Sequence, residues 1–191
     1  YTLRLTDLRD IDDIQEPQSP GAPMPERPDA RHVWQRVDVT DYEQVLAAAK
    51  GMDALINATV FRPHLVPAFQ VNVVGAYNVM RAAAECGIKR VIHTGPRHTR
   101  LSFEGDYYPD FEVPDEAPLH PGADLYALTK FLGGEIVRVF AERYEIQVVT
   151  FLFCSFRPAD APDAENGSVV LNLVDDSFTY ESTGNFNGSD S

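Results

Sequence analysis

Residues 54–95 read ALINATVFRPHLVPAFQVNVVGAYNVMRAAAECGIKRVIHTG, and this stretch decides the fold class. It opens with a continuously apolar segment at 54–56, which is typical of a strand that is buried on both faces. Apolar side chains then recur at helical spacing over 69–86, and Gly87 follows as a helix-ending glycine. Another strand is expected at 91–93. A strand, a helix and a strand in this order predict parallel strands joined by a crossover helix.

The same alternation continues on both sides of this stretch. Further strands are expected at 1–5, 33–37 and 147–153, and further helices after Thr40 or Asp41 and at 125–144. The sequence therefore predicts a doubly wound parallel α/β sheet over residues 1–158.

The last part of the chain has a weaker pattern. One more strand is expected at 169–174, whereas 181–191 is rich in Gly, Ser, Asn and Asp, which is typical of a disordered tail. We therefore expect residues 159–191 to form a remnant of a substrate-side region that ends in a disordered polar tail.

The composition excludes several classes of partner. The 191 residues include 29 acidic and 16 basic side chains, which gives a net charge of -13. Such a chain repels phosphate backbones and anionic lipids, so binding to nucleic acid or to a membrane is not expected. No apolar run approaches the roughly 20 residues that cross a bilayer, and no signal peptide is recognisable, so the default expectation is a cytoplasmic protein. No spacing of His, Cys and carboxylates resembles a metal site.

Polar side chains lie where the expected strands end, and ligands of a doubly wound sheet bind there. The residues at these ends are Asp7, Asp38, Val39, Asn57, Ala58, Thr59, Thr94 and Ser155. A carboxylate at Asp7 can accept both ribose hydroxyls of an adenosine and repels a 2′-phosphate, which favours NAD over NADP. Alternatively, Asp7 only begins a turn. Asp38 can likewise meet an adenine amino group, or it only starts the connection to the next helix.

Tyr126 and Lys130 are the strongest catalytic candidates. They are four residues apart in the helix expected at 125–144, so they lie on one face, one turn apart. The ordinary pKa of a tyrosine, about 10, is too high for a base at neutral pH, but a nearby ammonium lowers such a pKa. The phenolate can then take a proton from a substrate hydroxyl as a hydride leaves the carbon. Alone, this spacing also fits a surface pair.

The order of the segments adds a family resemblance. LTDLRD, VDVTD, LINATV, VNVVGAYNVMRAA, KRVIHTG and YALTKFLGGE, in this order and spacing, resemble the extended short-chain dehydrogenases/reductases of the NAD-dependent epimerase/dehydratase family. The resemblance covers about residues 1–158. Within the family, the segments around His98–Thr99, Tyr126 and Cys154–Ser155 are most similar to those of uronate dehydrogenase-like members.

The resemblance implies a Rossmann-like fold and NAD-linked chemistry on a sugar, sugar acid or nucleotide sugar. It implies that Tyr126 is the base and that Lys130 adjusts the phenol and reaches the nicotinamide ribose. Asn72 would organise the site through a water or backbone link near Lys130. A homodimer would pair through the helices at 69–86 and 125–144. Residues that would contact NAD are Asp7, Asp38, Val39, Asn57, Ala58, Thr59, Tyr126 and Lys130.

Three departures from the family pattern qualify this expectation. First, the sequence begins at what resembles the second strand, so the first strand and its glycine-rich turn, which cradles the pyrophosphate, are lacking. Second, Pro96 stands at the position of the catalytic Ser or Thr. Thr94 is the first substitute, followed by His98 and Thr99; otherwise the site is degenerate and the protein is a binding or regulatory module.

The third departure concerns the substrate. Leu152 stands where uronate dehydrogenases carry the arginine that holds the substrate carboxylate, and Arg157 is nearby but displaced. This difference argues either against a uronate substrate or for a shifted carboxylate clamp. Expected substrate contacts are His98, Thr99, Ser155 and Arg157.

Overall fold

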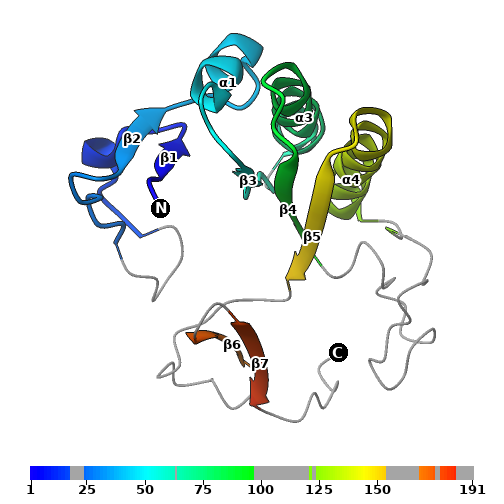
Figure 1. The fold of residues 1–191 in the computed structure, drawn as a ribbon. Helices are drawn as coiled ribbons and strands as arrows, with labels where there is room; N and C mark the ends of the chain where they lie inside the picture. Colours follow the sequence, from blue (N-terminus) through cyan, green and yellow to red (C-terminus); the bar gives the residue numbers. More distant parts are fainter. Residues whose placement is uncertain are drawn as a thin grey trace. The chain divides into compact units, whose positions relative to one another are not determined.

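Strands and helices alternate along the first 153 residues (Figure 1). The computed structural model describes residues 1–17, 24–62, 64–96, 121, 124–153, 168–174 and 177–183. The strands are β1 (Arg4–Asp7), β2 (Val33–Arg36), β3 (Leu55–Asn57), β4 (Arg90–Pro96), β5 (Gln147–Phe153), β6 (Ser168–Val174) and β7 (Ser177–Thr183). The α-helices are α1 (Tyr42–Ala49), α2 (Leu65–Phe69), α3 (Gly75–Glu85) and α4 (Leu125–Tyr144).

The chain divides into two compact units. The first contains Tyr1–Asp10 and Pro28–Phe153, and the second contains Ile11–Arg27 and Cys154–Ser191. The first unit therefore ends at β5, five residues before the boundary expected at residue 158.

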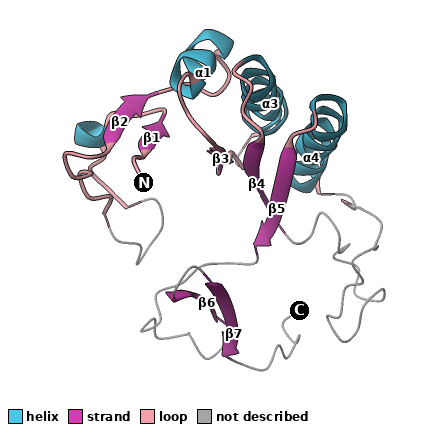
Figure 2. Ribbon diagram, in the orientation of Figure 1, coloured by secondary structure: helices cyan, strands magenta, loops and turns pink. Residues whose placement is uncertain are grey.

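All described strand pairs of the first unit are parallel, as expected. β1 pairs with β2, and β3, β4 and β5 form a separate sheet in the order β3-β4-β5. Figure 2 shows the strands and the helices that connect them. Within the described residues no strand pairs with both β1 and β3.

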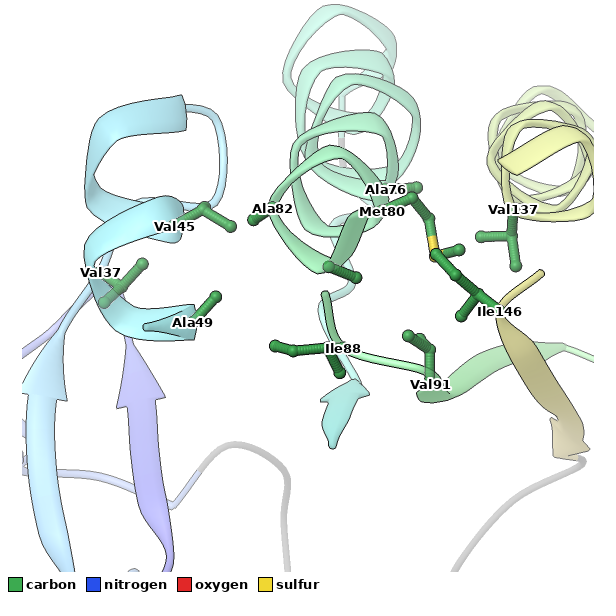
Figure 3. Close-up of a cluster of buried hydrophobic side chains, with 11 residues drawn as sticks. Val37, Val45, Ala49, Ala76, Met80, Ala82, Ile88, Val91, Val137 and Ile146 are labelled. Atoms are coloured by element: carbon green, nitrogen blue, oxygen red, sulfur yellow. The ribbon is translucent and has the colours of Figure 1, made fainter. Parts of the chain in front are cut away.

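Helices α1, α3 and α4 lie on the same side of the strands, with α3 packed between the other two (Figure 1). The main apolar core lies between these helices and the strands (Figure 3). Met80, on α3, is fully buried in it, and Val91 of β4 faces it with 2% of its surface exposed. Val45 of α1 and Val137 of α4 close the cluster from either side.

The expectation that the strand at 54–56, β3, is buried on both faces is wrong. Ile56 of β3, Ile92 of β4 and Val149 of β5 are register partners on the side opposite the helix-facing Val91. Ile56 is 68% exposed and Val149 is 54% exposed. The physical reason is that the helices which pack on these strands in the described structure all cover the other face.

The expected helix over 69–86 begins earlier than the spacing indicates. It starts with α2, passes through a π-helical turn at Gln70–Val74 and continues as α3. Because a π turn holds more residues than an α turn, the helical spacing does not run through it. Phe69 and Tyr77, which the spacing places on the apolar face, are 44% and 43% exposed. Gly87 follows the helix with a φ of 69°, as expected.

The expected start of α1 and the expected bounds of α4 and β5 are confirmed, whereas the expected tail is not. Asp41 caps α1 by accepting from the amides of Glu43 and Gln44, and α4 and β5 have the predicted bounds. In the second unit, β6 matches the expected strand and pairs with an antiparallel β7. Since β7 runs to Thr183, the expected disordered tail from residue 181 is wrong at its start, because residues 181–183 pair with β6. No helix in the described ranges is long and apolar enough to span a membrane.

Candidate active site

Buried polar side chains gather at the carboxyl ends of β3 and β4 and on the adjacent helices. The buried polar residues in the described structure are Asn57, Asn72, Asn78, His93, Thr129 and Lys130. Polar groups are rarely buried without a partner, because an unpaired donor or acceptor is costly away from water. All except Asn78 belong to one connected region, so this region is the candidate site.

Asn57, the last residue of β3, contacts its register partner His93 in the middle of β4. The Asn57 Nδ2 atom lies 3.3 Å from His93 Nδ1. Burial lowers the pKa of His93 to about 4, with a further contribution from the positive charge of Lys130. The imidazole is therefore neutral near pH 7 and can accept this hydrogen bond at Nδ1. Asn57 Oδ1 accepts from the Thr59 amide and hydroxyl at 3.2 and 2.7 Å, which shapes the turn after β3.

Lys130 reaches from α4 to this turn. Its Nζ donates to the Thr59 carbonyl at 3.0 Å, and only 5% of the residue is exposed. Burial, and to a smaller extent the nearby charge of Arg62, lower the pKa of Lys130 from 10.5 to about 8. Most Lys130 side chains therefore carry a proton at neutral pH, next to the strand end where a ligand of this sheet would bind.

Asn72 holds the same turn at its other end. Its side chain donates to the Phe61 carbonyl at 2.9 Å and accepts from the Phe61 amide at 3.1 Å. It also donates to Thr129 Oγ1 at 2.9 Å, and Thr129 Oγ1 donates to the Tyr126 carbonyl at 2.8 Å. Asn72 lies in the π-helical turn, a type of distortion that often occurs at functional sites. Asn72 thus ties the turn after β3 to the helix that carries Tyr126.

Gly133 allows α4 to approach this turn. A Cβ atom at this position would overlap the carbonyl oxygen of Asn72. The glycine therefore lets the two helices touch at the level of the site. Gly134, the next residue, has no atom within 4 Å of such a Cβ and makes no comparable approach.

Tyr126 lies at the start of α4, beside Arg62. The Arg62 guanidinium carbon is 5.4 Å from the centre of the Tyr126 ring, within the range of a cation–π contact. The positive charge of Arg62 also lowers the pKa of Lys130, so Arg62 lies near both members of the predicted pair. The structure therefore brings Tyr126, Lys130 and the turn after β3 together.

The strand-end residues at β1 and β2 form local contacts. Asp7 Oδ1 accepts from the Arg9 amide at 2.9 Å and lies 3.5 Å from Arg9 Nε. Asp38 Oδ1 accepts from the Thr40 amide and hydroxyl at 2.9 and 2.7 Å, within the connection that leads to α1. Val39 packs against Gly75, where an added Cβ would lie 2.8 Å from its Cγ1.

The remaining candidates divide between described and undescribed residues. Thr94, the first substitute for the catalytic hydroxyl, donates from Oγ1 to the Asn57 carbonyl at 3.1 Å, so it lies at the site. Ala58 is exposed in the turn between Asn57 and Thr59. Pro96 closes β4 and is in register with Phe153. The expected substrate contacts His98, Thr99, Ser155 and Arg157 lie outside the described residues.

Four residues of this site were not predicted from the sequence: Thr129, Gly133, His93 and Arg62. Thr129 and Gly133 belong to the YALTKFLGGE segment, and two glycines inside a helix are themselves a signal of close approach. His93 ends an apolar strand and carries no signal beyond that position. Arg62 lies in a loop, so no periodicity could have placed it next to Tyr126.

The sequence profile described as the NAD dependent epimerase/dehydratase family matches residues 14–176, which is most of the chain. The chain belongs to this family. The matched segment of this epimerase/dehydratase family member includes α1, α3, α4 and the candidate site.

Named relatives include a uronate dehydrogenase of Pseudomonas putida, which is 29% identical over 127 residues. That match covers 63% of this chain and 44% of the relative. The chain thus spans less than half the length of the curated relatives it matches.

Two solved structures show a similar fold. A glucuronic acid dehydrogenase of Chromohalobacter salexigens has a TM-score of 0.64 at 24% identity, with 81% of this chain and 52% of that chain covered. A short-chain dehydrogenase/reductase superfamily protein of Agrobacterium tumefaciens with bound NAD has a TM-score of 0.63 at 18% identity, with 83% and 51% covered. The family member described here therefore has a parallel-sheet, Rossmann-like α/β fold.

Proposed function

We propose that this protein takes part in NAD-dependent oxidoreduction or epimerisation of a sugar, sugar acid or nucleotide sugar. The observation that carries the proposal is the position of Lys130. Its largely buried ammonium is bound to the turn after β3 and lies one helical turn from Tyr126. Family membership and the solved relatives with bound NAD support the choice of cofactor.

In this proposal, Tyr126 is the general base. Lys130 holds a positive charge that stabilises the phenolate form of a neighbouring phenol. The phenolate accepts the proton of a substrate hydroxyl. Thr94 would polarise the oxygen by turning its hydroxyl proton from the Asn57 carbonyl toward the substrate. When bound, NAD supplies the acceptor for the hydride. Asn72 and Thr129 keep Tyr126 and the turn after β3 in register through their hydrogen bonds.

The described residues fit the two ends of a dinucleotide. One carboxylate oxygen of Asp7 contacts Arg9, and the other would accept a hydrogen bond from a ribose hydroxyl. The positive charge of Arg9 would weaken the discrimination of Asp7 against the 2′-phosphate of NADP. Asn57, Ala58, Thr59 and Lys130 line the strand end where a nicotinamide ribose would lie. The described part of the chain contributes no glycine-rich turn to hold the pyrophosphate.

Turnover by the full chain tests this proposal. Formation of NADH is followed with a panel of sugars, sugar acids and nucleotide sugars. Tyr126→Phe is expected to lower kcat by about 10² to 10⁴, the usual range for losing a general base or acid. Tyr144→Phe, on the same helix, is the matched control and should keep its activity. Equal turnover by Tyr126→Phe and the unmutated chain would remove Tyr126 from the mechanism.

A second candidate is a catalytically degenerate member that binds but does not turn over. Pro96 favours it, because proline at the end of β4 offers neither a hydroxyl nor an N–H to a substrate oxygen. This alternative predicts a folded chain with no NADH formation on any substrate. A Thr94→Val variant separates the two, since loss of turnover there would assign the hydroxyl role to Thr94.

We also propose a homodimer that pairs through the helical segments at 69–86 and 125–144. Large apolar side chains on these segments remain 43 to 48% exposed, namely Phe69 of α2, Tyr77 of α3 and Val139 of α4. Sedimentation of the chain should give a dimer, and Val139→Glu should give a monomer. A monomeric unmutated chain at micromolar concentration would contradict this proposal. The cytoplasmic location expected from the sequence stays a prediction.

A further inference from the structure

Arg62 is held next to the proposed base by its neighbour. Asn72 accepts from the amide of Phe61 and donates to its carbonyl, so the backbone that leads into Arg62 is fixed at the site. The Arg62 guanidinium then lies 5.4 Å from the centre of the Tyr126 ring. Arg62 is exposed, so the guanidinium is accessible beside the residue that would meet the substrate.

Arg62 and Lys130 place two cations close together in an acidic chain. Some described arginines pair with acids, as Arg81 does with Glu85, whereas others, such as Arg4 and Arg36, donate to backbone carbonyls. Within the described residues no carboxylate lies at ion-pairing distance from Arg62 or Lys130. Two neighbouring cations without an acid repel each other, and a bound anion would remove that cost.

We propose that Arg62 binds a carboxylate of the substrate, which makes the substrate an acidic sugar or a related hydroxy acid. This inference rests on the proposed function, because it assumes that the substrate lies at Tyr126. The planar guanidinium can donate two parallel hydrogen bonds to a carboxylate. This chain has Leu152 on β5 where uronate dehydrogenases carry the arginine that holds the substrate carboxylate. Arg62, in the turn after β3, would hold the carboxylate instead.

A phosphate is a poorer occupant of this position. Phosphates commonly bind the free amides of a helix N-terminus. At the start of α4, the carboxylate of Asp124 already accepts from the amides of Tyr126 and Ala127 at 2.8 and 3.2 Å. That end of the helix therefore holds a negative charge, which would repel a dianionic phosphate more strongly than a singly charged carboxylate.

Ligand titration of the full chain tests this inference without requiring turnover. D-glucuronate is the acidic probe and D-glucose is the neutral probe, and binding is followed by the amide NMR signals of Thr59 and Tyr126. Arg62→Ala is expected to weaken D-glucuronate binding at least tenfold and to leave the response to D-glucose unchanged. Arg62→Lys, which keeps the charge without the fork, should fall between them. Arg138→Ala is the matched control and should bind as the unmutated chain does.

Three outcomes would overturn the inference. They are equal D-glucuronate binding by Arg62→Ala and the unmutated chain, no D-glucuronate binding at all, and equally tight binding of D-glucose. Arg62-dependent binding in a chain that forms no NADH would support the inference while the proposed oxidoreduction fails. The two proposals are therefore tested separately.

Discussion

Lys130 is a charged residue in an almost fully buried position. Burial and the charge of Arg62 bring the pKa of Lys130 down from 10.5 to about 8. Removing the second cation in Arg62→Ala should therefore raise the pKa of Lys130 toward 10.5. NMR titration of the lysine ε-carbon measures this value. An unchanged or lower pKa in the variant would contradict the placement of Arg62 beside Lys130.

His93 makes the stability of the fold depend on pH. Its pKa is lowered from 6.5 to about 4 in the folded chain, mainly by burial. The unfolded chain therefore binds more protons between these values, so stability is fully present above pH 6.5 and is lost as the pH falls through 4. The free energy of unfolding should drop by up to roughly 3 kcal/mol over this window. Urea unfolding at several pH values measures it, and a His93→Gln variant should show a flatter profile.

At the residue scale, the sequence predicts the helix pair well and the strand ends poorly. Tyr126 and Lys130 share a regular helix, so spacing alone puts them on one face. Asp38 and Thr94 could be placed at strand ends, but their hydrogen-bond partners depend on loop geometry that no periodicity encodes. Arg62 escapes prediction for the same reason.

At the scale of elements, the contact between α4 and the π-helical turn depends on one small residue. A Cβ at Gly133 would overlap the Asn72 carbonyl, whereas a Cβ at Gly134 would meet no atom within 4 Å. Gly133→Ala should therefore destabilise the fold and separate Asn72 from Thr129. Gly134→Ala should stabilise it by roughly 0.5 to 1 kcal/mol, since alanine is the better helix former.

Thermal unfolding of the two glycine variants checks this contrast between adjacent positions. The same sign of effect for both variants would show that the helices do not approach closely at Gly133. The rate of NADH formation is a second measurement. It should fall in Gly133→Ala, because a displaced Asn72 would no longer hold the turn to which Lys130 is bound.

Helices and strands were predicted with correct bounds where the spacing of apolar residues stays regular through the whole segment. α4 and β5 match their expected bounds because uninterrupted apolar patterns end at clear signals. The helix over α2 and α3 was misplaced at its start because the π-helical turn breaks the spacing. β7 was not predicted, because polar residues such as Ser177 and Thr179 give its segment no continuous apolar pattern, and its last three residues were assigned to the tail.

At the scale of the whole molecule, the sheet of β3, β4 and β5 is covered on one face in the described structure. Met80 lies on the covered side and is fully buried, whereas Ile56 faces away and is 68% exposed. Met80→Ala should therefore cost roughly 2 to 5 kcal/mol of stability. Ile56→Ala should change stability by less than about 0.5 kcal/mol. Denaturant unfolding of both variants measures the difference, and a large cost at Ile56 would mean that the outer face is also packed.

The most direct test of the account is an NAD titration of the isotope-labelled chain, followed by its amide NMR signals. In the proposed function, the strand ends and the start of α4 form one NAD-binding site. The signals of Asp7, Asn57 and Lys130 should therefore shift together in a saturable way, while those of Glu142 and Tyr144, at the far end of α4, stay in place. Signals of Asp7, Asn57 and Lys130 that do not respond to NAD would contradict it.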